Sequence, residues 1–416
     1  MRANSLFVAL LLVAGATAVR AESAPDACNR VGCDLYRMLA NESERDVAVS
    51  PVSLCTQLAM LRLGASRLTA DELDRLLDPS GDEVDMVNAI SELAESLSTT
   101  DPAEQWQSIN RMWIDAMIRP PRGEFEAALN DQFGAEIVRV RFARRRDIRR
   151  VANQWAIRVS GGRVDDLVPP GWLEPDTCLI LTNIMLLDAK WERPFNAAMT
   201  TTTPFHLNRT KTRAVQMMQQ KSQFAYTEIE GAQVVEIPYE GDSLTMVLVV
   251  PKEIDGLASI EDGLSTKAVA TWIAELSRTV ADDDDNVRGG FGGRPGSRPL
   301  VTLKLPRFSV HSDSDLTGPL RAAGLKSLFS LEDADLTGIS SSQPLYLQGI
   351  LQSVLVDVDE NGTRAGVATR GKGGFGGGER VEVKADRPFL FFVRHVDSNA
   401  IVLIGRWTGL AERRRT

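Results

Sequence analysis

The sequence predicts an α+β fold, and three of its features support that class. Segments with apolar residues at helical spacing are concentrated before Gly161. Short alternating or continuously apolar runs, which are typical of strands, dominate the chain after Cys178. The connections between these runs are short, as they are between antiparallel strands. Helices followed by strands in this order are typical of an α+β domain.

Most of the expected helices lie in the first part of the chain, before Gly161. Ser50-Pro51-Val52-Ser53 offers a hydroxyl as an N-cap, and Thr69 and Glu72 have the spacing of a capping box. Helical spacing predicts helices at Cys33–Leu39, Ser53–Leu63, from Thr69 onward, Asp82–Ser98, Gly123–Gln132, Arg149–Ser160 and Thr266–Leu276.

The strands follow. Their apolar runs are bounded by glycine, proline and polar residues. We expect strands at Gln107–Asp115, Cys178–Asp188, Arg213–Met218, Phe224–Ile229, Val234–Pro238, Leu244–Val250, Leu300–Leu305, Leu345–Val358 and Phe389–Gly405.

A polar, glycine-rich stretch, 360–387, interrupts the last two strands. Residues 362–369 are mostly small and uncharged, as a chain that enters a crowded sheet must be. Residues 370–378 are mostly glycine, which favours many conformations. The run Val381, Val383, Ala385 then returns to an alternating pattern. The sequence therefore predicts an exposed loop held between two anchored strands.

Composition limits the functions that remain open. The chain has 416 residues with 43% hydrophobic and 25% charged residues, which is ordinary for a folded protein. A net charge of −9 argues against nucleic acid as a partner, because phosphates require a basic surface. We expect one domain over 22–416, with 281–299 (ADDDDNVRGGFGGRPGSRP) as a disordered surface insertion.

The first residues have the pattern of a secretory signal peptide over 1–21. Arg2 precedes an apolar run from Leu6 to Ala14, and Val19 and Ala21 fit the small-residue cleavage pattern. The alternative is an uncleaved anchor, but no apolar run reaches spanning length. We therefore expect a secreted protein that does not sit in a membrane.

Four cysteines are too few for a disulfide framework in so long a chain. Cys28 and Cys33 are close enough in sequence to form a disulfide with each other. Cys55 and Cys178 lie in apolar runs, where free buried thiols are expected. The sequence has no paired CxxC or HExxH spacing, so no metal or other cofactor is predicted.

Eight segments, taken together and in order, resemble the serpin family. They are SPVSLCTQLAMLRLGA (Ser50–Ala65), TNIMLLDAKWERPF (Thr182–Phe195), VQMM (Val215–Met218), VVEIPYEGDSLTMVLVVP (Val234–Pro251), LPRFSV (Leu305–Val310), DADLTGIS (Asp333–Ser340), ENGTRAGVAT (Glu360–Thr369) and ADRPFLFFVRH (Ala385–His395). The resemblance runs from about Cys33 to Leu410. It implies three β-sheets with eight or nine helices, a five-stranded central sheet and an exposed reactive loop.

The resemblance also implies a mechanism. A target protease cleaves the loop and forms an acyl-enzyme. The cut loop then enters the central sheet as a further strand before water can release the protease. The family's hinge, where insertion begins, falls on Glu360, Gly362, Thr363, Ala365, Gly366, Val367, Ala368 and Thr369. Arg364 stands where Glu is commoner and is expected to face solvent.

Other matched positions are expected to let the sheet open. Ser53, Thr56 and Asn183 match the family's polar residues there, and Trp191 matches the tryptophan where the loop first enters. Gln352 replaces the family's usual His and can still donate and accept a hydrogen bond.

The family's spacing from Thr363, and counting back from Pro388-Phe389, are what the resemblance offers for placing the scissile bond. Both place it near Gly376-Gly377, and Phe375-Gly376 is ranked first because glycine offers no side chain to a specificity pocket. Lys372 and Arg380 are trypsin-type alternatives. The expected targets are chymotrypsin-, elastase- or subtilisin-like enzymes.

Two surface features remain. The sequons begin at Asn41, Asn208 and Asn361, and a glycan on Asn361 would obstruct insertion. The arginine cluster around Arg144, Arg145 and Arg146 is either a solvated helix face or a weak contact site for a sulfated polysaccharide.

Three classes of function were compared. An enzyme is disfavoured, because the only histidines are His206, His311 and His395 and no GxSxG is present. A suicide inhibitor of secreted serine proteases, acting as a monomer, is preferred on the hinge composition. The alternative is a non-inhibitory serpin with a storage, carrier or chaperone role, which Arg364, Asn361, Gln352 and the glycine-rich bait support.

Overall fold

The computed structural model describes residues 22–81, 85–98, 104–281, 298–341, 345–363 and 380–410. The predicted signal peptide, residues 282–297 of the predicted insertion and residues 364–379 of the loop lie outside these ranges.

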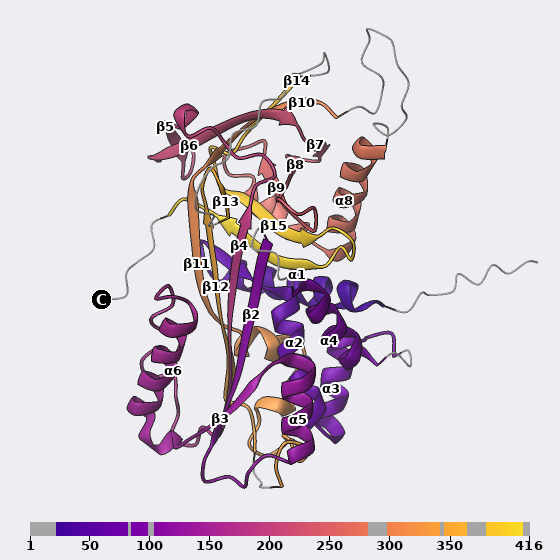
Figure 1. The fold of residues 1–416 in the computed structure, drawn as a ribbon, viewed down its shortest axis with the longest axis vertical. Helices are drawn as coiled ribbons and strands as arrows, with labels where there is room; N and C mark the ends of the chain where they lie inside the picture. The colour runs from indigo at the N-terminus through magenta and orange to yellow at the C-terminus, as the bar shows by residue number, and fades with distance from the viewer. Residues whose placement is uncertain are drawn as a thin grey trace, which may run out of the picture.

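Nine α-helices occur in the described part of the chain, six of them before residue 160 (Figure 1). They are α1 (Ala24–Asn41), α2 (Pro51–Gly64), α3 (Arg67–Leu77), α4 (Met86–Leu97), α5 (Gly123–Phe133), α6 (Arg145–Val159), α7 (Leu257–Asp262), α8 (Thr266–Ala281) and α9 (Thr317–Ala322). Three 3-10 turns add η1 (Phe142–Arg144), η2 (Ala197–Met199) and η3 (Ser327–Phe329).

The strands form three sheets. The central sheet has the order β11 (Phe308–Asp315), β12 (Gly349–Val358), β13 (Gly362–Thr363), β4 (Leu179–Lys190), β2 (Glu104–Asp115) and β3 (Glu136–Val140). The second has the order β1 (Val47–Val49), β16 (Ile401–Trp407), β15 (Phe389–His395), β9 (Leu244–Pro251), β8 (Ala232–Pro238) and β7 (Ala225–Ile229). The third has the order β14 (Arg380–Lys384), β10 (Leu300–Pro306), β6 (Thr212–Gln223) and β5 (Thr201–His206).

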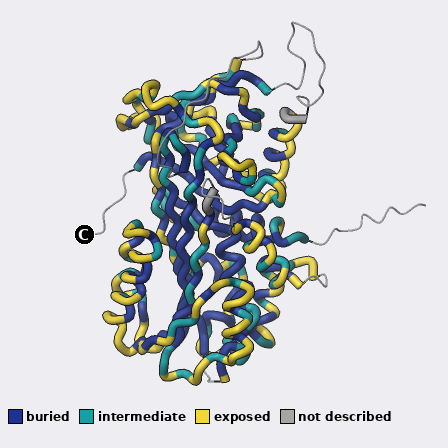
Figure 2. Tube along the Cα trace, in the orientation of Figure 1, coloured by how far each residue is buried: buried dark blue, intermediate teal, exposed yellow. Residues whose placement is uncertain are grey.

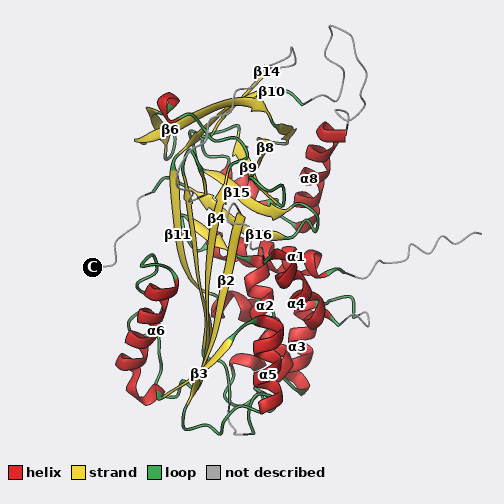
Figure 3. Cartoon of the chain, viewed as in Figure 1, coloured by secondary structure: helices red, strands yellow, loops and turns green. Residues whose placement is uncertain are grey.

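The central sheet is buried on both faces, which explains why β4 and β12 are almost continuously apolar. Helix α6 lies over one face, while α2 and its neighbouring helices lie on the other (Figures 1 and 3). The residues of β4 and β12 that face α6 pack with Trp113 and Trp155, and the alternate residues join the main core with α2. The buried strands run between these two covers in Figure 2. Any strand added to this sheet must therefore fit a core on both sides.

The predicted α+β class and three-sheet architecture are confirmed. Five long strands form the central sheet, as the family resemblance implied, and the two-residue β13 lies among them. The predicted single run Phe389–Gly405 is two strands, β15 and β16, paired antiparallel.

The predicted capping box at Thr69 is wrong. Helix α3 begins at Arg67, and Thr69 and Glu72 bind the η3 turn instead. Thr69 Oγ1 accepts from the Ser327 hydroxyl at 3.1 Å, and Glu72 accepts from the Ser327 amide at 2.8 Å. These side chains join α3 to a distant part of the chain, which local sequence spacing does not reveal.

The predicted disulfide between Cys28 and Cys33 is also wrong, because both are free in the structure. They lie five positions apart in α1, so they point to different faces of the helix. Cys28 packs into the main core, and Cys33 packs into the core beneath the second sheet. No helix in the described part of the chain is long and apolar enough to cross a membrane.

Candidate functional site

The candidate site is the place where the hinge meets the central sheet. Strands β12 and β4 pair in parallel, Gly349 with Ile180 through Leu355 with Leu186. Beyond Leu355 the two strands separate and β13 fits between them. Thr363 of β13 lies opposite Val358 of β12 and opposite Ala189 of β4, antiparallel to both. The first two hinge residues thus already occupy the sheet.

Thr363 is held by a buried aromatic pair. Its side chain is fully buried, and its hydroxyl oxygen lies 2.6 Å from the phenolic oxygen of Tyr239. Tyr239 in turn stacks on Trp191, with ring centroids 4.5 Å apart and planes 7° from parallel. The threonine hydroxyl is therefore satisfied in a pocket from which water is excluded.

Gly362 is required by close packing. A Cβ at this position would lie 2.1 Å from the carbonyl oxygen of Ala189. No side chain can be accommodated at that distance without moving β4. Gly362 therefore fits the space that is available, and Thr363 makes the hydrogen bond, so the Gly-Thr pair suits the site in both respects.

The backbone before Gly362 is tied to the turn that follows β4. Trp191 uses both of its donors here: its amide donates to the Asn361 carbonyl at 2.9 Å and its indole Nε1 to the Asp359 carbonyl at 3.0 Å. The Phe195 amide donates to the Glu360 carbonyl at 2.8 Å. The base of the hinge is thus fixed by two backbone bonds and by one bond that requires the indole of Trp191.

Glu360 adds a side-chain anchor. Its carboxylate is buried and accepts hydrogen bonds from Arg307 Nε at 2.8 and 2.9 Å and from the Thr200 hydroxyl. Burial alone raises the pKa of Glu360, but the hydrogen bonds from Arg307 and Thr200 outweigh it and hold that pKa below its usual range. Glu360 is therefore a charged anchor at neutral pH.

The polar residues below the hinge form two separate groups. In the first, Gln352 Oε1 accepts from the Ser50 amide at 2.9 Å, and the hydroxyl oxygens of Ser50 and Ser53 lie 2.8 Å apart. The hydroxyl of Ser50, the N-cap of α2, also reaches the Val402 carbonyl at 2.7 Å. This group connects β12, α2 and β16.

The second group lies between β4 and β2. Asn183 donates to Asn110 Oδ1 at 2.8 Å and to the Ser108 hydroxyl at 3.0 Å, while its own Oδ1 is buried without a partner among the described residues. Thr56 donates to the Val52 carbonyl within α2. The structure therefore joins Ser53 to Gln352 through Ser50, but it does not join Thr56 or Asn183 to them.

The far end of the loop is anchored in a different sheet. Arg380 begins β14, which pairs in parallel with β10, so that Arg380 lies opposite Leu300. Residues 364–379 thus connect two strands of different sheets (Figure 1). The predicted hinge residues Ala365, Gly366, Val367, Ala368 and Thr369 and the predicted bait residues Lys372, Phe375, Gly376 and Gly377 lie in this stretch, outside the described residues.

The remaining predicted residues are on the surface. Asn41 and Asn208 are exposed and Asn361 is half-buried. Arg144, Arg145 and Arg146 are exposed around the start of α6.

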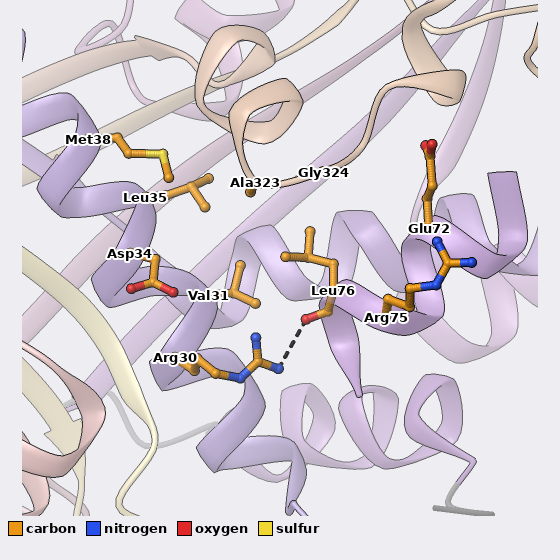
Figure 4. A pocket seen from close by; sticks show the side chains of 10 residues that line it. All are labelled: Arg30, Val31, Asp34, Leu35, Met38, Glu72, Arg75, Leu76, Ala323 and Gly324. Carbon is orange, nitrogen blue, oxygen red and sulfur yellow. Dashed lines mark hydrogen bonds between the residues drawn. The ribbon is translucent and has the colours of Figure 1, made fainter. Parts of the chain in front are cut away.

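Two cavities lie apart from the hinge. One, of about 330 Å³, is lined by α1 and α3 with the turn after α9, and Arg30 at its rim donates to the Leu76 carbonyl (Figure 4). The other, of about 530 Å³, is bordered by Glu236 and Arg394, which pair with each other at 2.7 Å. Within the described ranges, no group of three His, Cys, Asp or Glu residues is placed to hold a metal ion.

Sequence reasoning missed four residues of this site: Tyr239, Arg307, Thr200 and Ser50 as a partner of Gln352. Tyr239 and Arg307 each follow the end of an apolar run, where they look like ordinary strand ends. Their role depends on contacts with residues more than fifty positions away. The one available signal was the polar Ser50 directly before the apolar α2.

The chain is similar to known proteins both in sequence and in fold. A family model described as "Serpin (serine protease inhibitor)" matches residues 26–409. Leukocyte elastase inhibitor of Bos taurus is 31% identical over 390 residues, covering 91% of this chain and 97% of that protein. The structure of Serpin48 from the insect Tenebrio molitor, described as a highly specific serpin, matches with a TM-score of 0.78 at 25% identity, covering 93% of this chain and 98% of that one. Human thyroxine-binding globulin in complex with its hormone matches with a TM-score of 0.81 at 22% identity over 94% of this chain and 99% of that one, a likeness of fold alone.

Proposed function

The chain belongs to the serpin family, and from that premise we propose that it is a secreted suicide inhibitor of serine proteases. One observation carries the proposal. Gly362 and Thr363, the first hinge residues, already form a strand between β12 and β4. A strand that has begun to enter where two parallel strands diverge can grow longer if those two strands, here β12 and β4, move further apart.

The register of β13 says where each further residue would go. If the strand continues in the register of Thr363, Val367 would lie between Met185 of β4 and Val354 of β12, and Thr369 between Asn183 and Gln352. Thr369 would bring a hydroxyl to Asn183, whose buried Oδ1 has no described partner. The stretch thus matches the sheet that would receive it.

Side-chain alternation supports the same conclusion. Alternate residues of a strand face opposite sides of the sheet. Positions on the side of Thr363, which faces the main core, are Ala365, Val367, Thr369, Gly371 and Gly373, all small or uncharged. The charged residues of this stretch, Arg364, Arg370 and Lys372, all fall on the side of α6. In the same register Arg364 would lie between the half-buried Asp188 and Asp357. The side of the inserted strand that faces the main core would therefore carry no charge.

Before the loop moves, the target protease carries out the proposed chemical steps. Its serine attacks the Phe375 carbonyl, the bond to Gly376 breaks, and the Gly376 amine leaves with a proton. The chain up to Phe375 stays esterified to the protease. Insertion then adds backbone hydrogen bonds on both edges of the new strand and carries the protease away before water hydrolyses the ester.

Strand pairing argues against one of the alternative scissile bonds. Phe375 lies in the stretch between the two anchored strands, whereas Arg380 is paired in the ladder of β14 and β10. Phe375-Gly376 therefore remains our first choice, with Gly377 and Lys372 as alternatives. This scissile bond favours chymotrypsin-like, elastase-like or subtilisin-like proteases as targets.

The basic surface adds a weaker proposal. Arg144, Arg145 and Arg146 are exposed around the start of α6, whose first turn carries one acidic residue, Asp147. Three adjacent exposed arginines support a weak contact with a sulfated polysaccharide. The alternative is a solvated helix face.

A second candidate, a non-inhibitory serpin with a storage, carrier or chaperone role, is favoured by the sequon at Asn361. Asn361 lies at the mouth of the opening, and the Thr363 hydroxyl of its sequon is buried against Tyr239. A glycan added before folding would hold the hinge outside the sheet. Intact-mass analysis before and after glycosidase shows whether the site is used.

The test of the proposed function is thermal unfolding of the protein before and after cleavage in the loop. Insertion adds a full-length strand to the central sheet, so the cleaved inhibitor should unfold at a much higher temperature than the intact one. An unchanged unfolding temperature would favour the non-inhibitory alternative.

A further inference from the structure

We propose that Cys28 of α1 and Cys55 of α2 form a disulfide bond when the chain folds in an oxidising compartment. In the structure both are free thiols. The bond would link α1 and α2 in the helical layer beneath the central sheet, apart from the hinge. It rests on the proposed secretion of the chain but not on any action on a protease.

The two helices approach each other closely at one point. Gly32 of α1 faces Pro51 of α2 so tightly that a Cβ on Gly32 would lie 2.3 Å from Pro51 Cγ. Packed helices are usually separated by about 8–10 Å, and contact through glycine allows the shorter distances. Disulfides need Cα atoms within about 7 Å of each other, so a helix crossing of this kind is where one can form.

Cys28 and Cys55 lie next to this contact on the same two faces. Cys28 is four residues before Gly32 and Cys55 is four residues after Pro51, and side chains four positions apart share a helix face. The two helices therefore bring the cysteines together on one side of the Gly32–Pro51 contact. Both side chains are fully buried in the same core.

The end of α1 that carries Cys28 is held in place. Arg30 donates to the Leu76 and Leu77 carbonyls at the end of α3 and forms an ion pair with Glu22 at 2.8 Å (Figure 4). Asn29 donates to the Asn399 carbonyl and accepts from the Ile401 amide. The turn of α1 that directly follows Cys28 is therefore held in place by α3 and by the start of β16.

The other cysteines are placed differently. Cys33 is buried in the core beneath the second sheet, on another face of α1. The Cys178 thiol donates to the Tyr346 carbonyl at 3.1 Å, and burial raises its pKa to about 11. These positions favour one pairing, Cys28 with Cys55.

The chemistry is thiol–disulfide exchange. A thiolate of one cysteine attacks a small-molecule or protein disulfide, and the second cysteine then displaces the mixed disulfide, so that the oxidant leaves as two thiols. Its contact with Cys55 and its burial raise the pKa of the Cys28 thiol well above the usual value. The raised pKa slows exchange once both thiols are buried, so the bond should form while α1 docks onto α2.

The test is a disulfide map of the full chain, secreted by a eukaryotic host or refolded with oxidised and reduced glutathione. The protein is alkylated under denaturing, non-reducing conditions and digested. We expect one linked peptide pair containing Cys28 and Cys55, and alkylated Cys33 and Cys178. Reduction should lower the unfolding temperature by roughly 5 °C, because the bond restricts the unfolded chain.

Matched variants separate the bond from simple core packing. Cys55→Ala should abolish the linked pair and the effect of reduction on unfolding temperature. Cys33→Ala removes an equally buried thiol from the same helix and should leave both unchanged. Alkylation of all four cysteines in the oxidised wild-type protein, or a linked pair other than Cys28 and Cys55, would overturn the proposal, whether or not any variant folds.

Discussion

The hydroxyl of Thr363 and the phenol of Tyr239 lie 2.6 Å apart at the point where the hinge enters the central sheet. Both side chains are fully buried, and the two residues come from segments far apart in the sequence. Their contact holds Thr363, the last described residue of the hinge, in place within the sheet. It is therefore the contact at which a partly entered strand is stabilised.

Replacing Tyr239 by Phe should destabilise the intact protein by about 1–2 kcal/mol, because the Thr363 hydroxyl loses a partner in a buried site. Equilibrium unfolding in urea measures the change. Tyr226→Phe is the control, since Tyr226 is half-buried and its hydroxyl donates to the exposed Glu228. Equal stability of Tyr239→Phe and wild type would show that the contact does not hold the hinge.

The Glu360–Arg307 pair predicts a pH dependence. Because the folded pKa of Glu360 lies below its usual value of 4.5, its contribution to stability is present above that value and is lost as pH falls through the folded pKa. Glu360→Gln should cost about 1 kcal/mol at pH 7, a modest figure because Arg307 is nearly half exposed. The cost should shrink below about pH 4.

Thermal unfolding of wild type and Glu360→Gln across the acid range checks this prediction. Glu382→Gln is a matched control, because Glu382 pairs with Lys304 on the surface of the third sheet. A difference between wild type and Glu360→Gln that stays constant from neutral to acid pH would argue against a charged Glu360.

The proposed register places Val367 in the main core. Val367→Glu would put a carboxylate between Met185 and Val354, whereas Val367→Thr would put a side chain of the same shape and no charge there. Burial of an unpaired charge costs several kcal/mol. Val367→Glu should therefore reduce the yield of trapped protease at least tenfold, a factor worth about 1.4 kcal/mol.

Val367→Thr should have a smaller effect on that yield. Titration of protease activity against inhibitor concentration measures both variants. If Val367→Glu traps protease as well as Val367→Thr does, residue 367 does not enter the main core in the proposed register.

Phe375→Ala tests the scissile bond. Loss of the only large apolar side chain between residues 370 and 379 should slow association with chymotrypsin about tenfold or more. The unfolding temperature of the intact protein should not change. Arg380→Ala is the control, and a larger effect of that variant with trypsin would move the scissile bond toward β14.

The fold was largely predictable from the sequence, because β4 and β12 are too continuously apolar to be anything but strands buried on both faces. The match of Gly362 and Thr363 to the Gly-Thr pair of the serpin family likewise indicated where a hinge begins. These are local patterns, and local patterns determine which elements form.

The contacts of the site were not predictable in the same way. The partners of Thr363, Glu360 and Gln352 are Tyr239, Arg307 and Ser50, which come from other sheets and helices. The capping box at Thr69 and the disulfide at Cys28 failed for the same reason. In each case the nearby residue had a suitable side chain, but packing placed a distant residue closer.

Incubation of the mature protein with chymotrypsin, followed by denaturing electrophoresis and mass analysis of the released C-terminal peptide, tests the central claim most directly. An inhibitor that inserts its loop should give a complex that survives SDS and a peptide that begins at Gly376. Complete cleavage without any such complex, at every ratio of protein to protease, would contradict it.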